Sequence, residues 1–217
     1  MGNTDFLWGN NTLKADEIMD KMELVKPSYP YRGGFIYQNI FYLVAGQVIE
    51  KVSGQSWGDF LTANIFKPLG MNRTRTTILN MPDDNYSHPH FRVDSVVQPI
   101  LFDTADAIGP AGSVRSSISD ISLWVKAMID SSKYPGGRLV KPPTWNELLK
   151  PQNFVDEASF YPTARLTKPN FTTYALGWFQ QDYKGKKLNF HTGSLAGEIA
   201  IHGQIPVSYT HLRAHET

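Results

Sequence analysis

The sequence predicts an α+β fold in which helices precede a strand-rich last third of the 217-residue chain. Apolar residues between Ile40 and Val52 recur at every third or fourth position, which is the period of an amphipathic helix. From Tyr174 to His191 the pattern changes to short apolar runs on either side of Tyr183–Lys186, with a glycine at the turn, which is typical of a β-hairpin.

The composition is that of a globular protein, with 41% hydrophobic and 12% aromatic residues. A net charge of +1, from 21 basic and 20 acidic side chains, gives no field that would gather nucleic acid or an anionic membrane. Without cysteine there is no disulfide, thiolate nucleophile or Cys-ligated zinc. No apolar run reaches the length of a membrane span. We expect a small-molecule or peptide substrate and no cofactor; nothing in the sequence indicates an oligomeric state.

Several helices are marked by their ends. Thr12 or Asp16 is placed to start a short helix that runs to about Leu24. Asn39 is expected to cap the helix that follows the Gly33–Asn39 turn, and Gly54 to end it. The expected core face of that helix is Ile40, Phe41, Val44, Ala45, Val48, Ile49 and Val52.

Two later helices follow the same logic. Ser56 to Asp59 forms a capping box for a helix to about Phe66, closed by Pro68 and Gly70. Ser117 or Ser119 is expected to cap a helix with an apolar face from Ile121 to Met128, and a shorter helix is expected around Thr144 to Leu149.

The stretch from Ile78 to Phe102 is polar and rich in proline, which predicts a surface loop. His88 and His90 lie near Asp83 and Asp84, and these side chains have metal-ligand chemistry. A metal site needs three or four convergent and oriented groups, and a loop gives no such scaffold. We therefore predict a solvated loop and no metal.

Two short motifs have the chemistry of a site. Tyr37 and Asn39 stand two residues apart before a core helix, either as a polar catalytic corner or as a turn with a satisfied Tyr and a capping Asn. His191-Thr192-Gly193-Ser194 ends the second predicted strand, where small residues let a ligand lie along the edge and the Ser194 N–H is able to stabilise an oxyanion. A buried structural histidine is the alternative interpretation.

A third motif suggests a different enzyme. Gly54-Gln55-Ser56-Trp57-Gly58 fits the nucleophile elbow of an α/β-hydrolase, and His191 or His202 with an intervening Asp would complete a triad. The elbow requires a strand immediately before the serine, whereas a helical pattern precedes Ser56. Capping by Ser56 is the better interpretation.

Taken together, the motifs resemble the serine β-lactamase and penicillin-binding-protein-like superfamily, in its class C β-lactamase and serine esterase branch. The resemblance covers roughly residues 5 to 206 and implies a partial β-lactamase/DD-peptidase-like fold, with a helical lobe and part of an antiparallel sheet. It also implies a periplasmic or secreted location. The phrases that carry it are Tyr37-Gln38-Asn39, Gly46–Gly54, Phe66–Thr74, Pro110–Ser113, Leu176–Trp178 and His191–Ser194.

The resemblance implies roles for six residues. Tyr37 would be the general base, which needs nearby positive charge to lower its pKa from about 10, and the Ser194 N–H would form half of the oxyanion hole. Asn39, Thr192 and Gly193 would hold the substrate. His191 stands where β-lactamases carry lysine, a departure shared by esterase and peptidase members, so β-lactam hydrolysis is less expected as the main activity.

The nucleophile implied by the resemblance belongs to a Ser-x-x-Lys motif upstream of Tyr37. None of the fifteen serines has a lysine three residues later, and thirty-six residues precede Tyr37. We therefore expect an internal fragment of a serine hydrolase that is inactive as it stands, with residues 1–206 as the partial domain. Residues 207–217 resemble a translated sequencing adapter and are expected to be a non-native tail. A family member that binds peptide or cell-wall ligands without turnover is a further alternative.

Overall fold

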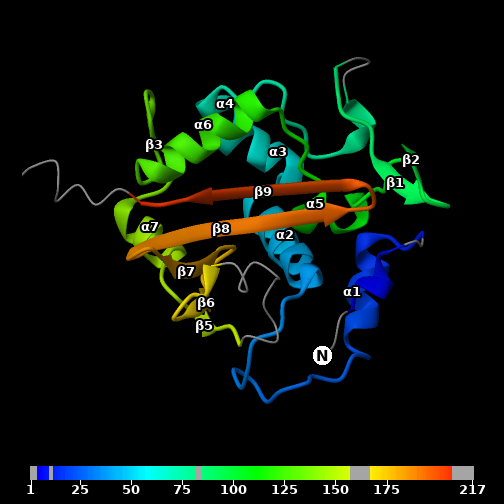
Figure 1. The fold of residues 1–217 in the computed structure, drawn as a ribbon, viewed down its shortest axis with the longest axis horizontal. Coiled ribbons are helices and arrows are strands. Elements are labelled where there is room, and N and C mark those ends of the chain that lie inside the picture. The colour runs from blue at the N-terminus through cyan, green and yellow to red at the C-terminus, as the bar shows by residue number, and fades with distance from the viewer. Residues whose placement is uncertain (1–3, 10–11, 82–84, 157–166, 207–217) are drawn as a thin grey trace, which may run out of the picture. The chain divides into compact units, whose positions relative to one another are not determined.

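The computed structural model describes residues 4–9, 12–81, 85–156 and 167–206 (Figure 1). The chain divides into two compact units. The first unit comprises Met1–Leu123 and Thr192–Ala200, and the second comprises Trp124–His191 and Ile201–Thr217. The expected tail, residues 207–217, lies outside the described residues.

Helices dominate the chain before residue 150. The α-helices are α1 (Ala15–Met22), α2 (Asn39–Ser53), α3 (Trp57–Leu61), α4 (Lys67–Leu69), α5 (Gly109–Gly112), α6 (Ile118–Ile129) and α7 (Pro142–Leu148). Short 3-10 helices span Asp5–Leu7, Ile78–Asn80 and Asp106–Ile108, and a π-helical turn spans Thr62–Phe66. None of the helices in the described part of the chain has both the length and the apolar character needed to cross a bilayer.

The strands form two small hairpins and one five-stranded sheet. The hairpins pair β1 (His90–Val93) with β2 (Val96–Pro99) and β3 (Lys133–Tyr134) with β4 (Gly137–Arg138). The sheet has the order β5 (Asn153–Phe154), β6 (Thr172–Tyr174), β7 (Phe179–Tyr183), β8 (Lys186–Leu195) and β9 (Glu198–Gln204). Neighbouring strands are antiparallel, as Figure 1 shows for β8 and β9. The helices and the antiparallel sheet confirm the predicted α+β class.

The predicted hairpin around Lys184 and Gly185 is confirmed, but its first strand is displaced. Lys184 and Gly185 adopt φ values of 49° and 73°, as a two-residue primed turn requires. The strand before the turn is β7, which begins at Phe179 and not at Tyr174. Gly177, with φ of 83°, lies in a turn in which the Ala175 N–H donates to the Trp178 carbonyl at 2.8 Å. This turn separates Tyr174, in β6, from β7.

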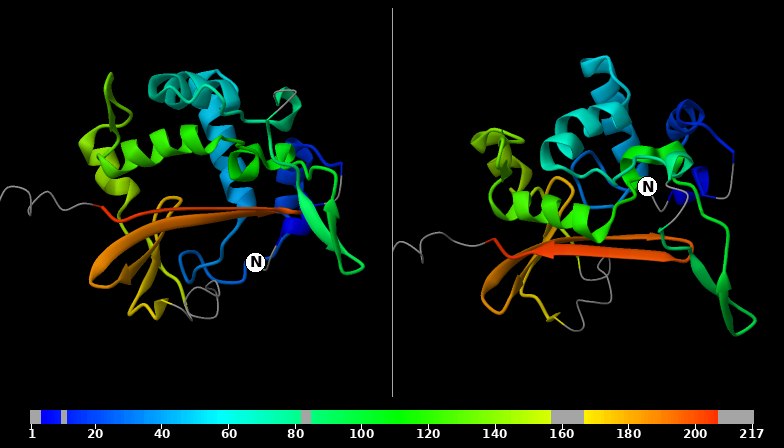
Figure 2. Two further views of the ribbon diagram at one scale, coloured as in Figure 1. Left: turned by 45° about the horizontal axis from the view of Figure 1, so that its top comes forward. Right: turned by 90° about the horizontal axis from the view of Figure 1, so that it is seen from above.

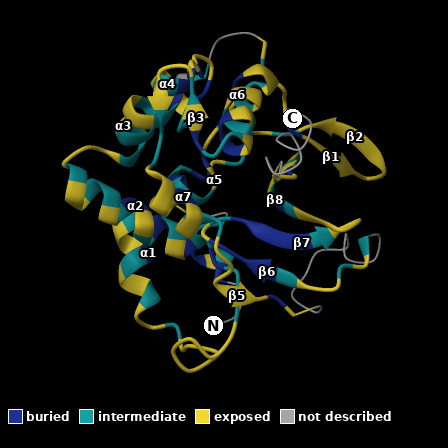
Figure 3. Ribbon diagram, turned by 90° about the vertical axis from the view of Figure 1, so that its left-hand side faces the viewer, coloured by how far each residue is buried: buried dark blue, intermediate teal, exposed yellow. Residues whose placement is uncertain are grey.

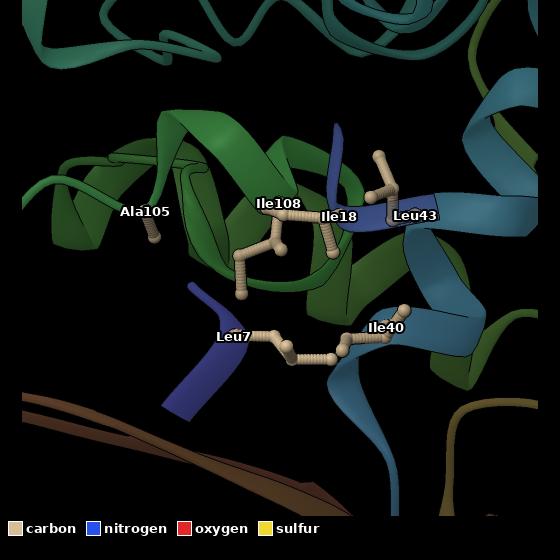
Figure 4. Close-up of a cluster of buried hydrophobic side chains, with 6 residues drawn as sticks. All are labelled: Leu7, Ile18, Ile40, Leu43, Ala105 and Ile108. Carbon is tan, nitrogen blue, oxygen red and sulfur yellow. The ribbon is translucent and has the colours of Figure 1, made fainter. Parts of the chain in front are cut away.

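One hydrophobic cluster organises the first unit. Its buried members come from four segments that are far apart in the sequence, and Figure 4 shows their side chains converging: Leu7, Ile18, Ile40, Leu43, Ala105 and Ile108. Ile18 and Ile40 are fully buried. At about 25 cal/mol per Å² of apolar surface removed from water, such side chains contribute about 2 kcal/mol each.

The core face of α2 differs from the predicted one. Ile40, Leu43 and Gly46 are the buried positions, whereas Phe41, Val48 and Val52 are exposed, Val52 to 82%. The difference has a steric cause, because α2 packs against α5 at Gly46, where a Cβ would lie 2.2 Å from the Pro110 ring. Glycine has no apolar side chain, so the apolar periodicity of the sequence does not reveal Gly46 as a contact position.

The ends of α2 agree with the prediction at one end only. Gly54 ends the helix in the left-handed region at φ 70°, as expected. At the start, the N-cap is Gln38 and the helix begins at Asn39. The predicted capping role of Asn39 is therefore wrong, and its side chain donates instead to Asp5.

Ser56 and Ser117 act as helix caps, as predicted. The Ser56 hydroxyl accepts the Asp59 N–H at 3.1 Å, and the Ser117 hydroxyl accepts the Asp120 N–H at 3.2 Å. The helical run from Trp57 passes through the π-helical turn and continues to Leu69, so Pro68 lies inside its last turn, before Gly70 ends it at φ 75°.

The stretch from Ile78 to Phe102 is more ordered than predicted. It contains the β1–β2 hairpin, every residue of which is exposed, and Figure 3 shows the hairpin in the colour of exposed residues. Asp94 and Ser95 make its turn with φ of 48° and 68°. The surface position was predicted correctly, but the strands were missed because the turn carries no glycine and the strands bury no apolar face.

The second unit has its own core along β6, β7 and β8, the first two of which Figure 3 shows as largely buried. Phe179 lies 4.7 Å from Tyr174 and 5.8 Å from Phe190 between ring centroids. The fully buried Gln180 is paired, since its amide donates to the Leu149 carbonyl and to the Asn189 side chain, both at 2.9 Å.

Candidate active site

Tyr37 lies in an extended segment immediately before α2. A turn closed by the Gly33 N–H and the Pro30 carbonyl, 2.8 Å apart, precedes this segment. The tight turn therefore comes earlier than predicted, and residues 35–38 form no regular element. Gln38 is buried and accepts a hydrogen bond from the Thr4 hydroxyl. This bond to Gln38 holds the backbone on which Tyr37 sits.

Asn39, at the first turn of α2, is part of a small polar group. Its side-chain amide donates to Asp5 Oδ1 at 3.2 Å, and the Trp8 indole N–H donates to the same oxygen at 2.9 Å. One carboxylate oxygen thus orients both side chains. The amide predicted to hold substrate is positioned by Asp5, a contact across 34 residues of chain that no local pattern indicates.

The predicted strand-end motif, from His191 to Ser194, occupies the last part of β8. Ala196 and Gly197 form the two-residue turn to β9, with Gly197 at φ 72°. In such a hairpin the residues that flank the turn exchange backbone hydrogen bonds, and successive residues direct their N–H groups to opposite edges. Ser194, one residue before the flanking Leu195, therefore directs its N–H away from β9.

In the described part of the chain, no paired strand covers that edge of β8 at Ser194. The paired positions of β8 and β7 end at Phe179 and Phe190, so the pairing does not extend to Ser194. A Cβ built at Gly193 meets no atom of the described residues within 4 Å, and Gly193 and Ser194 are both exposed. Among the described residues, the strand end therefore offers a backbone donor and an uncovered edge.

The α2 start and the β8 end share one core. Ile40, which follows Asn39, belongs to the cluster of Figure 4, and Leu195, which follows Ser194, packs against the same cluster. Each candidate group is thus one residue away from a side chain held in this core. A packed core fixes backbone positions more firmly than a loop does.

His191 is held by aromatic neighbours of the second unit. Its Nε2 lies 3.2 Å from the Tyr174 hydroxyl, and its ring centroid lies 5.4 Å from that of Phe179. Tyr174 is buried and His191 is half-buried, so the hydrogen bond is partly shielded from water. The sequence did not predict this partner, because Tyr174 was assigned only to a strand.

The pKa of a second histidine of the same unit, His202, is affected by His191. Burial lowers the pKa of His202 below its ordinary value of 6.5, and the charge of His191 lowers it further. The His202 ring lies edge-on to Trp178, with centroids 5.1 Å apart. The neutral form of His202 is therefore favoured in the folded protein.

A partly buried ion pair fixes the β8–β9 turn in the first unit. Arg115 Nη1 donates to Glu198 Oε2 at 2.6 Å, and Arg115 Nη2 donates to the Asp103 carbonyl at 3.3 Å. The Gly197 carbonyl also accepts the His90 N–H at 3.2 Å, and Figure 2 shows the β1–β2 hairpin beside this turn. Sequence reasoning missed Arg115, although it follows shortly after the Pro110–Ser113 motif.

Ser56 does not form a nucleophile elbow. The residues before it belong to α2, with no strand, and its hydroxyl donates to Asp59 Oδ2 at 2.7 Å. The alternative of an α/β-hydrolase with Ser56 as nucleophile is therefore wrong. Likewise, the described residues contain no group of three or more potential metal ligands; Asp83 and Asp84 lie outside them.

Comparison with known proteins agrees with this fold. An unguisins hydrolase of Aspergillus campestris is 24% identical over 201 residues, covering 85% of this chain and 34% of the relative. The octameric penicillin-binding protein homologue from Pyrococcus abyssi superposes with a TM-score of 0.75 at 22% identity, over 95% of this chain and 46% of that one. A D-stereospecific amidohydrolase from Streptomyces sp. gives 0.73 at 20% identity, over 94% and 56%.

The chain therefore spans between a third and somewhat over half of the length of these three proteins. The family model described as Beta-lactamase matches residues 2–207, which is nearly the whole chain. The predicted superfamily is thereby confirmed. The chain belongs to the Beta-lactamase family.

Proposed function

We propose that this chain is part of a serine hydrolase that forms an acyl-enzyme on an ester, peptide or β-lactam carbonyl, with a nucleophilic serine outside the chain. The observation that carries the proposal is the common core beneath the start of α2 and the end of β8, through Ile40 and Leu195. It supports a constellation in which the groups next to these residues, Asn39 and Ser194, work on one substrate.

The proposed chemistry has two halves. In the first, the serine oxygen attacks the carbonyl while Tyr37 takes its proton, and the Ser194 N–H donates to the oxyanion. The C–O or C–N bond then breaks, and Tyr37 returns the proton to the leaving group. In the second half, Tyr37 takes a proton from water as the water oxygen attacks the acyl-enzyme carbonyl. The ester bond to the serine then breaks, the serine oxygen regains the proton, and the acid is released.

The other site residues bind and orient the substrate. Asn39, held by Asp5, donates to the substrate carbonyl side chain, and Thr192 with Gly193 docks its backbone along the β8 edge. His191 directly precedes Thr192 in β8, and its ring is held by the Tyr174 hydroxyl. A histidine gives a titratable group in place of a permanent charge, which favours ester and amide substrates over β-lactams that bear a carboxylate.

The relatives lend support at the level of reaction class. They include proteins described as a hydrolase, a penicillin-binding protein homologue and a D-stereospecific amidohydrolase. By itself the 217-residue chain would be inactive, because a base and an oxyanion donor without a nucleophile are only part of a cooperative unit.

A fluorophosphonate probe tests the proposal on the protein from the complete gene. We expect mass spectrometry to find the probe on a serine encoded upstream of residue 1, followed three residues later by lysine, and Ser56→Ala to label as the wild type does. Probe on Ser56 would overturn the assignment. A complete protein with no labelled serine would support a family member that binds peptide or cell-wall ligands without turnover.

A further inference from the structure

A hollow of about 510 Å³ lies beside the β8–β9 turn in the first unit. Its lining includes Ser194, the proposed oxyanion donor, and the turn residues after it. Trp8 and Phe91 are aromatic residues of its lining, and Asp103 and Glu198 are acidic ones. In the proposed function, a group attached to the reacting carbonyl at Ser194 would enter this hollow.

Contacts within the protein hold the residues that line the hollow in place. Trp8 is tied to Asp5 through its indole N–H and packs against the buried cluster. The β1–β2 hairpin, which carries Phe91, is joined to the turn by the hydrogen bond from His90 to Gly197. A pre-formed wall costs little ordering entropy when a ligand binds.

The two carboxylates differ in charge balance. Glu198 is neutralised by Arg115 at 2.6 Å, with both side chains largely buried. Asp103 interacts with Arg115 through its backbone carbonyl, and no basic side chain of the described residues forms an ion pair with its carboxylate. Of the two acidic residues that line the hollow, Asp103 is therefore the one without an ion pair among the described residues.

We propose that this hollow binds the acyl side of the substrate and selects acyl groups that combine an apolar or aromatic body with a positively charged amine, which Asp103 pairs with. The inference rests on the proposed function for its position next to the reacting carbonyl. Aromatic faces attract cations as well as apolar groups, and a carboxylate adds a charge-assisted hydrogen bond. Acyl groups with a carboxylate would meet repulsion from Asp103.

Binding tests the inference without any hydrolysis. The probes are 2-phenylethylammonium, the neutral 2-phenylethanol and the anionic 3-phenylpropionate, titrated into the 217-residue chain with the Trp8 indole N–H signal in NMR as the readout. We expect the ammonium probe to bind about fivefold more tightly than the alcohol, the factor that corresponds to about 1 kcal/mol for a solvent-accessible ion pair. Asp103→Asn should remove the difference.

The matched control is Asp94→Asn, which makes the same charge change in the exposed β1–β2 turn, away from the lining of the hollow. It should keep the fivefold preference. Equal affinities for the ammonium and the alcohol, an equal loss in both variants, or no binding of any probe would overturn the inference.

Rates on the complete protein extend the test to turnover. Phenylalanine ethyl ester and ethyl 3-phenylpropionate differ only in the amine, which also makes the ester carbonyl intrinsically more reactive. We therefore expect the ratio of their kcat/KM values to fall about fivefold from the wild type to Asp103→Asn. Hydrolysis of neither ester would overturn the proposed function, whereas the binding ratios decide on the hollow by themselves. Hydrolysis of both esters with the same kcat/KM ratio in the wild type and in Asp103→Asn would overturn the inference alone.

Discussion

Replacing Gly46 with alanine tests the packing that sets the position of α2. An alanine in a helix interior is normally favoured over glycine by about 1 kcal/mol. At this position the new Cβ would lie 2.2 Å from Pro110 Cγ and 3.0 Å from Pro110 Cβ. Relaxed carbon–carbon contacts are about 3.5 to 4 Å, so either the rigid proline ring or the helix must move by about 1 Å or more.

Overpacking of this kind costs about 1 to 3 kcal/mol, and the contact with a ring puts Gly46→Ala at the upper end of that range. Subtracting the gain in helix propensity leaves a net loss of about 2 kcal/mol in the free energy of unfolding. The assay is urea denaturation followed by helical circular dichroism. Ala45→Gly, at an exposed neighbouring position, measures the propensity component separately and should cost about 1 kcal/mol.

The double variant Gly46→Ala with Pro110→Ala should recover most of the loss, because it removes the ring that the new methyl group meets. A Gly46→Ala chain that is more stable than the wild type, or a double-mutant cycle without coupling between the two positions, would refute the reasoning.

Three further predictions concern other parts of the chain. In the complete protein, His191→Lys should shift relative kcat/KM from esters toward β-lactams that bear a carboxylate, because a permanent charge replaces a titrating group; unchanged ratios across a pH series would contradict it. Asp120→Ala should cost about 2 to 4 kcal/mol in urea denaturation, since the buried Asp120 carboxylate accepts the Arg73 N–H and the Thr74 hydroxyl, both at 2.8 Å; a loss below about 0.5 kcal/mol, the range of a surface change, would contradict it. Burial and His191 lower the pKa of His202 in the folded state, so its contribution to stability is present above its ordinary value of 6.5 and is lost as pH falls from there through the lowered pKa; urea midpoints should fall less between pH 7.5 and 5.5 in His202→Asn, and an equal fall would contradict the burial argument.

Local signals predicted the elements whose causes are local. Ser56 and Ser117 cap helices because each is followed three residues later by an N–H that its hydroxyl reaches. Gly54 and the Lys184-Gly185 turn adopt positive φ, the conformation that turns and helix ends require. The order of helices and strands, and hence the α+β class, follows from such signals and from the change in period.

The parts that were missed depend on contacts between distant residues. The buried face of α2 is set by Pro110 against Gly46, and Asn39 was diverted from capping by Asp5. The Tyr174–His191 and Arg115–Glu198 contacts likewise join residues 17 and 83 positions apart. Periodicity and capping rules describe neighbours along the chain, so they do not predict the distant groups that hold the candidate site residues.

The complete protein provides the decisive measurement, which is the rate of p-nitrophenyl ester hydrolysis by Tyr37→Phe and Ser56→Ala beside the wild type. Tyr37→Phe keeps the ring and removes the proton acceptor, so we expect its kcat/KM to fall by about 10² to 10⁴, the contribution typical of a positioned general base. Ser56→Ala should hydrolyse the ester at the wild-type rate, since Ser56 caps α3. Full activity in Tyr37→Phe, with activity lost in Ser56→Ala, would contradict the proposed mechanism.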